Sequence, residues 1–495
     1  MHFKYTRICI FLIFIVSSFT ISAEHPSFEP LFSIKEAFNT EQAPLVYSED
    51  EVFELGLRFS ECIPGSEGWN RCISAFEKIK KEVTSQEMKA LSEEDRGRAV
   101  LKYLYRDYLK KYDLNQTKLD TAIETGNYNC VSSAVLYLAA AKAAGLQVYG
   151  QHTTQHAFCS IYVNSQKENQ AAKAIKIDVE TTNPYGFNPG SKEEIENQNQ
   201  IKKYYVVPKK YYANRVQVSD GVFTGLIAGN LCSDYIKKNN YFKAVPLGAV
   251  RYNIIQNQKN NTSASVRNQF DILPCNYINQ ITESAEEYTS RLEWFTDFIE
   301  RWGSNEFVQK NMDSCFNNLF VLCIKEKNYP LAQTYYKSLS FYVSEKQLNK
   351  SQEILTDIYI LSETDGLTSR NQIDKIMEIK ESGDFTEVQQ KRADLYLETA
   401  WLDILNPYMK IREYNTGYSE SLEAETMLPQ SSSIKKMKQA FYSNIIALIH
   451  NNFAREANQK HFDEALEILN KGLADFPDDK TLLRDLTELK KILEK

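Results

Sequence analysis

The spacing of hydrophobic positions divides the first half of the chain into helices and strands. Apolar side chains recur at three- and four-residue spacing in residues 100–109 and 131–144, which predicts two amphipathic helices. Ser92, with Asp95 three residues later, resembles the capping box that opens a helix. In residues 156–163 and 175–179 apolar and polar positions alternate instead, as they do in strands. We therefore predict an α+β fold for the N-terminal half.

Two polar segments flank the second predicted strand. Residues 164–172 join the two strands and are predicted to form a surface loop. Residues 183–190 read Asn-Pro-Tyr-Gly-Phe-Asn-Pro-Gly, a composition that favours turns and that no regular element would tolerate. Two short strands around one loop favour an antiparallel hairpin.

From about residue 220 onward the pattern is helical, and three windows share a helix-turn-helix arrangement. These windows are 316–336, 453–477 and, in part, 239–244. They resemble tetratricopeptide repeats, in which a small residue on the second helix allows the pair to pack closely. Unrelated amphipathic helices are the alternative interpretation. Residues 414–434, which end in three serines, are predicted to be a linker between repeats.

The N-terminus has the order of a secretory signal peptide. Lys4 and Arg7 precede the apolar run 8–16, and small residues follow up to Ala23. The apolar run is short for a membrane span, which needs about 20 residues. We expect cleavage after Ala23 and an exported protein, periplasmic or secreted, without a transmembrane domain. An uncleaved N-terminal anchor is the alternative.

Composition narrows the function classes. The chain has 495 residues, with 43% hydrophobic and 25% charged, which is enough for two or three folded domains. Its net charge is −7, without a basic run, so nucleic acid and anionic lipid are not expected partners. We predict a signal peptide at 1–23, an α+β domain at 24–205 and a helical repeat domain at 206–495.

Nine cysteines are present, and Cys9 lies in the predicted signal peptide. Cys62 and Cys72 stand ten residues apart around a Pro-Gly-Ser turn. In an oxidising compartment they are the best candidates for a disulfide.

Cys130 is the candidate nucleophile. It precedes the predicted helix 131–144, and a cysteine at a helix N-terminus lies at the positive end of the peptide dipoles, which favours the thiolate. The same position places backbone N–H groups where they could stabilise an oxyanion. Taken alone, a cysteine at this place is more often a small buried hydrophobic residue.

Two histidines lie inside the α+β segment, and His156 is the better candidate base. In an antiparallel hairpin around the 164–172 loop, His156 would stand directly opposite Asp178. Asp178 could then hold the imidazole while its other nitrogen meets Cys130. Glu180 lies on the same strand face and competes with Asp178, which we favour. His152 competes with His156 from the loop before the strand.

A zinc site is an alternative for part of this group, because His152, His156 and Cys159 have ligand-like spacing. In a strand, however, His156 and Cys159 point to opposite faces. We therefore predict neither a metal nor a cofactor.

The order of these motifs resembles the transglutaminase-like core of the papain-like cysteine superfamily. The resemblance covers about residues 90–190 and rests on the segments Gly126–Cys130, Ala143–Leu146, His156–Phe158 and Ile177–Asp178. It implies a papain-like fold with Cys130 as nucleophile, His156 as base and Asp178 as the orienting acid. Phe158 stands where the family more often has tryptophan, and residues 179–182 replace a frequent Asp-Pro turn.

Two functions follow from this interpretation. The first is an exported cysteine hydrolase, a peptidase or amidase, that acts on a protein or peptide while the repeat domain binds a protein partner. Transfer to a second amine is the other outcome that the same chemistry allows. The alternative function is a catalytically inactive scaffold in which the repeats bind a protein partner.

Overall fold

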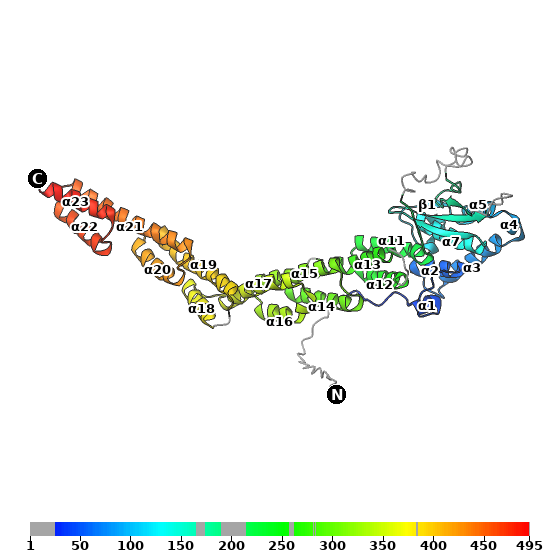
Figure 1. Cartoon of the computed structure of the whole chain (residues 1–495), viewed down its shortest axis with the longest axis horizontal. Coiled ribbons are helices and arrows are strands. Elements are labelled where there is room, and N and C mark those ends of the chain that lie inside the picture. The colour runs from blue at the N-terminus through cyan, green and yellow to red at the C-terminus, as the bar shows by residue number, and fades with distance from the viewer. Residues whose placement is uncertain are drawn as a thin grey trace, which may run out of the picture. The chain divides into compact units, whose positions relative to one another are not determined.

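The computed structural model describes residues 25–164, 174–189, 214–256, 262–280, 282, 284–382 and 385–494. The chain divides into two compact units. Among the described residues, the first unit contains those up to 280 together with 290–308, and the second contains the remaining ones. The first unit therefore extends well beyond residue 205 and includes helices that the sequence pattern assigned to the repeat domain (Figure 1).

Helices precede, cover and follow a small sheet in the first unit. The elements up to the sheet are α1 (Ile34–Phe38), α2 (Glu49–Phe59), α3 (Glu67–Val83), α4 (Gln86–Ala90), α5 (Glu93–Asp107), β1 (Lys111–Tyr112), α6 (Leu119–Thr125), β2 (Asn127–Tyr128) and α7 (Cys130–Ala143). The sheet and the helices after it are β3 (Gln147–His152), β4 (Ala157–Asn164), β5 (Ala174–Val179), β6 (Val216–Val218), α10 (Asp220–Thr224), α11 (Leu226–Lys237), α12 (Tyr241–Ile255), α13 (Thr262–Ile278) and α14 (Ala285–Trp302). The predicted helices at 100–109 and 131–144 and both predicted strands are confirmed.

The four strands form an antiparallel sheet in the order β5-β4-β3-β6. Helix α7 packs against β3 and β4 on one side and against α2 on the other (Figure 1). Every residue of α7 from Val131 to Ala141 is buried. A helix that is apolar around its whole circumference must be enclosed in this way. Its first residue, Cys130, is only partly buried, so the helix starts at the edge of the core.

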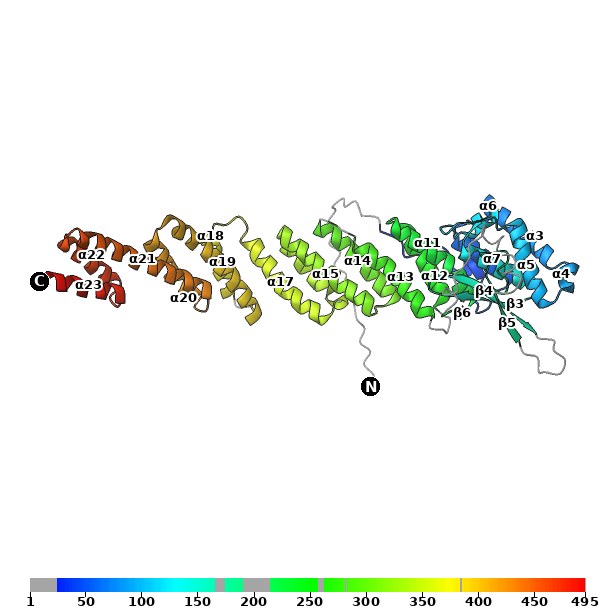
Figure 2. The ribbon, with the colours of Figure 1, turned by 90° about the horizontal axis from the view of Figure 1, so that it is seen from above.

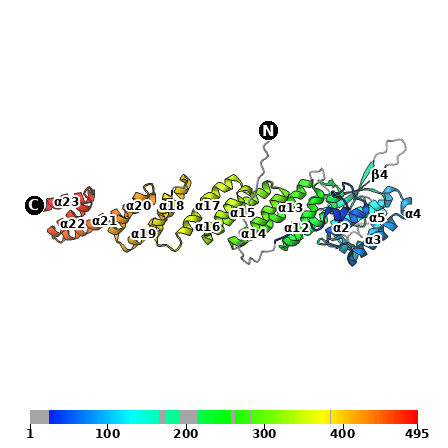
Figure 3. The ribbon, with the colours of Figure 1, turned by 90° about the horizontal axis from the view of Figure 1, so that it is seen from below.

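The described part of the chain after α14 is helical, which confirms that expectation for the C-terminal region. Its elements are α15 (Glu306–Glu326), α16 (Tyr329–Leu339), η2 (Ser340–Tyr342), α17 (Glu345–Glu363), α18 (Ser369–Glu381), α19 (Glu387–Ile411), α20 (Tyr414–Met427), α21 (Ser432–Asn458), α22 (Phe462–Asp475) and α23 (Lys480–Leu493). Consecutive helices from α18 to α23 lie side by side (Figure 3). Trp401 and Phe441 are fully buried in the core between α18 and α21.

Four helix–helix corners of the described chain share one backbone pattern. A residue with positive φ is followed by a cap with ψ between 65° and 75°, and the cap N–H donates to the carbonyl five residues earlier. The caps are Asn240, Asn328, Glu413 and His461. Each is followed by an aromatic residue and, three residues later, by a buried small one: Ala244, Ala332, Gly417 or Ala465.

The third of these corners corrects the predicted linker at 414–434. Residues 414–427 form α20, and Ser431 caps α21. The residues that α20 buries are Gly417, Ser421 and Ala424, which are small and not strongly apolar. A Cβ added at Gly417 would lie 2.3 Å from a ring atom of Phe441, so the close helix contact requires glycine. The hydrophobic pattern missed the helix because its core face is built from small residues.

Four further expectations concern the disulfide, the signal peptide, the loop at 164–172 and membrane spans. Cys62 and Cys72 are both free thiols, so the predicted disulfide is wrong for this structure. Burial, together with the neighbouring Cys62, raises the pKa of Cys72 to about 12, which keeps it a thiol. The predicted signal peptide and residues 165–172 of the predicted loop lie outside the described residues. In the part of the chain that is described, no helix combines the length and the apolar character needed to cross a bilayer.

Candidate active site

Cys130 is held at the first position of α7 by the residues around it. Gly126 ends α6 with a φ of +74°, and Asn129 caps α7. The side-chain oxygen of Asn129 accepts hydrogen bonds from the N–H groups of Val131 (2.9 Å) and Ser132 (3.1 Å). The N–H of Cys130 bonds to no acceptor among the described residues. It is therefore this one N–H, not several, that is available to an oxyanion beside the sulfur.

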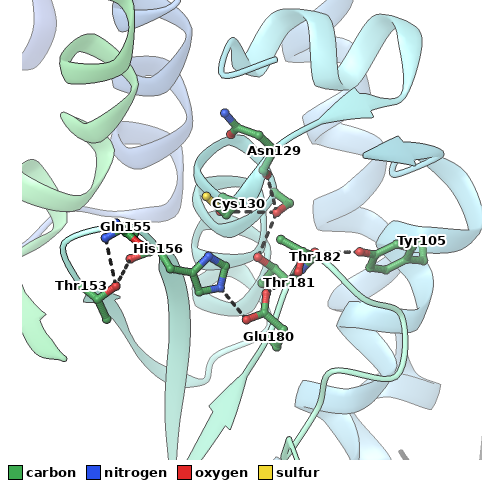
Figure 4. A network of polar contacts seen from close by, with 10 residues as sticks. Tyr105, Asn129, Cys130, Thr153, Gln155, His156, Glu180, Thr181 and Thr182 are labelled. Atoms are coloured by element: carbon green, nitrogen blue, oxygen red, sulfur yellow. Dashed lines mark hydrogen bonds and ion pairs between the residues drawn. The ribbon is translucent and has the colours of Figure 1, made fainter. Parts of the chain in front are cut away.

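His156 lies in the turn between β3 and β4. Its carbonyl accepts hydrogen bonds from the N–H of Thr153 (2.9 Å) and from the Thr153 hydroxyl (3.3 Å). The same hydroxyl accepts from the N–H of Gln155. This closed turn fixes the backbone of His156, so the ring direction is set by the local fold (Figure 4).

Glu180 directly follows β5 and holds the imidazole. Its Oε2 lies 2.6 Å from His156 Nε2, while its Oε1 accepts from the N–H (3.0 Å) and the hydroxyl (2.7 Å) of Thr182. A Cβ at Gly186 would lie 2.1 Å from the carbonyl oxygen of Glu180, so the tight loop after the strand depends on glycine. The side chains of His156 and Glu180 are only 4% and 3% exposed, which shields their interaction from water.

The ring of His156 links Glu180 to Cys130. Burial lowers the pKa of His156, but hydrogen bonds to Cys130 and Glu180 outweigh it and raise the pKa to about 10. Because Nε2 is engaged by Glu180, the other ring nitrogen is the one that serves Cys130. Figure 4 shows the ring between the sulfur and the carboxylate. Cysteine, imidazole and carboxylate therefore converge from a helix N-terminus, a turn and a strand end.

Asp178 is not part of this group. In the observed register it stands opposite Ser160, whose hydroxyl donates to Asp178 Oδ1 at 2.7 Å, and it pairs with Arg215. The predicted pairing of His156 with Asp178 is therefore wrong. In the observed register Ser160 pairs with Asp178 and Asn164 with Ala174, so β5 is displaced by four residues from the predicted pairing. His156 lies before the start of β4, and the carboxylate that reaches it lies two positions after Asp178. The competing candidate Glu180 occupies that place.

The remaining sequence candidates have other surroundings. His152 is the last residue of β3, not a loop residue, and burial followed by the charge of Arg251 lowers its pKa. Cys159 is fully buried in β4, and its sulfur lies 3.3 Å from the carbonyl oxygen of Ala134. Within the described residues, no three potential ligands are grouped so that they could hold a metal ion.

A second layer of polar residues, which sequence reasoning missed, supports the Glu180 loop. The hydroxyls of Ser133 and Thr181 lie 3.0 Å apart, which ties the loop to the first turn of α7. The Tyr105 hydroxyl donates to the carbonyl of Thr181 at 2.8 Å. The only available signal was the unusual run Glu180-Thr181-Thr182 after a strand, whose buried polar side chains need partners.

A cavity of about 300 Å³ opens beside the cysteine and the histidine. Its walls come from the 114–117 segment, the start of α7, the β3–β4 turn and one face of α11. The lining residues include Cys130, His156, Asn115, Gln155, Asn230 and Asp234. The volume is at the lower end of the range typical of small-ligand sites. A short polar segment of a substrate could therefore reach the sulfur.

Comparison of the chain with protein-family models, with curated proteins and with solved structures yields no significant match. A partly exposed thiol, a base beside it and a buried acid behind the base are the arrangement that nucleophilic catalysis requires.

Proposed function

We propose that the protein is a cysteine hydrolase that cleaves amide bonds through Cys130, His156 and Glu180. The observation that carries the proposal is the position of the His156 ring, which hydrogen-bonds Glu180 through Nε2 and has Cys130 on its other side (Figure 4). The thiolate is the reactive form of cysteine, and a protonated imidazole supplies the positive charge that stabilises it. The raised pKa of His156 supports this charge state at neutral pH.

The proposed reaction has two steps. The sulfur of Cys130 forms a bond to the substrate carbonyl carbon, and the N–H of Cys130 donates to the oxygen that becomes negative. His156 then protonates the leaving amine, the C–N bond breaks, and a thioester remains. In the second step His156 takes a proton from water, which attacks the thioester. The C–S bond breaks and releases the acid and the Cys130 thiolate, so that the thiolate and the protonated His156 are restored. Glu180 keeps the ring oriented in both steps.

The wider proposal is a papain-like, transglutaminase-like core joined to tetratricopeptide-like repeats in an exported protein. It is supported by a cysteine on a helix that packs against an antiparallel sheet, with the base and the acid at strand ends. The shared helix corners support the repeats, which we propose bind the protein partner or substrate. Export is tested by N-terminal sequencing of the mature protein, which should begin at Glu24.

Acylation by an activated ester tests the enzymatic proposal without knowledge of the substrate. The full chain is mixed with p-nitrophenyl acetate, and the acetylated peptide is identified by mass spectrometry. We expect one acetyl group on Cys130 that is lost again by hydrolysis, and no such group in Cys130→Ala. Acetylation that does not involve Cys130 contradicts the proposal.

Alkylation by iodoacetamide at pH 6 provides a second measurement. The other free cysteines of the described chain are buried, whereas Cys130 is partly exposed. We expect Cys130 to react far faster than any of them. Slow and uniform labelling, with no acetyl intermediate, would favour the alternative function, an inactive scaffold in which the helical repeats bind a partner.

A further inference from the structure

Arg251 is a buried charge that the proposed reaction does not use. It lies on α12, and the residue is only 6% exposed. Its Nη1 donates to Gln269 Oε1 of α13 at 2.5 Å, and its Nε is buried without a hydrogen-bond partner among the described residues. A Cβ built at Gly229 of α11 would lie 2.9, 3.0 and 3.2 Å from three guanidinium atoms. The guanidinium therefore lies directly against α11 at Gly229.

No carboxylate of the described chain compensates this charge. Gln269 is neutral, and the side chains that interact with Arg251 electrostatically include Cys232 and His152, neither of which is a carboxylate. Burial raises the pKa of Cys232 to about 12, so it stays a neutral thiol. By contrast Arg267, on the neighbouring α13, bonds Asp271 and two backbone carbonyls. Buried arginines are ordinarily paired in this second manner, because an uncompensated buried charge is strongly destabilising.

The guanidinium faces a cavity. Arg251, Gln269, Ser233 and Gly229 line a space of about 220 Å³ whose other walls are apolar residues of α11 and α13. The three helices α11, α12 and α13 lie next to one another in the first unit (Figure 2). Ser233 lines both this space and the cavity beside Cys130, so the two are separated only by α11.

We propose that the cavity between α11, α12 and α13 binds a small oxyanion, a carboxylate or a phosphate-type anion, through the guanidinium of Arg251. The planar fork of N–H donors matches two oxygen atoms of such an anion. The apolar walls would exclude water from the pair and so strengthen it. The site does not depend on the reactivity of Cys130.

Thermal unfolding of the full chain tests the proposal with defined anions. The melting temperature is measured at pH 7.5 against rising phosphate, sulfate, acetate or succinate, with sodium chloride holding the ionic strength constant. We expect a saturable rise with at least one oxyanion and none with chloride alone. A response to phosphate or sulfate only would identify an inorganic oxyanion as the ligand, and a response to the acids only would identify a carboxylate.

Three variants assign the effect to Arg251. Arg251→Met removes the charge but keeps the length of the side chain, and it should abolish the rise while leaving stability in chloride equal or higher. Gly229→Ala keeps the charge but displaces the guanidinium, and it should weaken the rise. Lys243→Met, on the exposed face of the same helix, should leave it unchanged.

Either of two results would overturn the proposal. One is the absence of any saturable oxyanion effect on the unaltered chain, or an equal effect in Arg251→Met. The other is an Arg251→Met chain that fails to fold in chloride, which would mean that a partner within the protein already compensates the charge.

Discussion

Two regions of the molecule contain the same chemical pair, a histidine bound to a buried carboxylate. In the first unit His156 meets Glu180, and both side chains are almost completely buried. In the second unit His450 of α21 meets Asp485 of α23 through Nδ1. There the carboxylate is 2% exposed, but the imidazole is 39% exposed.

The difference lies on the other side of each ring. Beyond its ring, His156 adjoins Cys130 and a cavity. No described cysteine lies on α21 or α23, because all of them precede residue 324. His450 instead lies near the ring of Phe453 on its own helix. A histidine–carboxylate pair is therefore by itself a structural interaction. It becomes a candidate catalytic group only when a nucleophile and a space for substrate adjoin it.

Replacing each of the two histidines should give the largest difference between a catalytic and a structural pair. His156→Gln removes the base, so turnover of p-nitrophenyl acetate at Cys130 should fall by about 10³-fold, within the range of general-base effects. His450→Gln should leave turnover unchanged. Equal losses in the two variants, or none in His156→Gln, would remove the functional distinction between the two pairs.

The pH dependence of stability gives the next largest difference. The folded-state pKa of His156 is about 10, above the ordinary value of 6.5. Its stabilising contribution is therefore complete below pH 6.5 and is lost as the pH rises through about 10. We expect urea unfolding to show that the original chain loses a few kcal/mol more over this window than His156→Gln does. His450→Gln should keep the steep pH dependence of the original chain.

The two neighbouring carboxylates, Asp178 on β5 and Glu180 directly after this strand, provide a smaller effect. Glu180→Gln keeps the shape of the side chain but offers an amide to His156, so turnover should fall by about 10²-fold. Asp178→Asn disturbs only the contacts with Ser160 and Arg215, and turnover should change less than about twofold. Steady-state rates across pH 5–9 measure both. A larger loss in Asp178→Asn would restore the pairing that the sequence suggested.

The sequence predicted the elements around the site well because their signals are local. The alternation at 156–163 and the apolar run after Cys130 correspond to β4 and α7. The orienting carboxylate was not predictable in the same way, because it depends on the register of a hairpin. The observed register places Ser160, not His156, opposite Asp178, and no local pattern distinguishes Asp178 from Glu180 on one strand face.

The helical region shows a related limit of the hydrophobic pattern. The corner at Asn328 and the one at His461 were recognisable because Ala332 and Ala465 follow an aromatic residue. The corner at Glu413 has Gly417 in that place, and its helix buries small residues, so it resembled a linker. Close helix packing is specified by small residues at the helix contact, and a search for large apolar side chains does not detect them.

The smallest predicted effect concerns the pair in the second unit. Asp485→Asn retains an oxygen that can accept from His450 but removes the charge, so the free energy of unfolding of that unit should fall by about 1 kcal/mol. The buried position of Asp485 and its second contact, with Arg484, make the loss measurable by urea unfolding. Turnover at Cys130 should not change, because no described contact joins this pair to the cysteine. A loss of turnover in Asp485→Asn would mean that the second pair also takes part in function, and the contrast between the two regions would then fail.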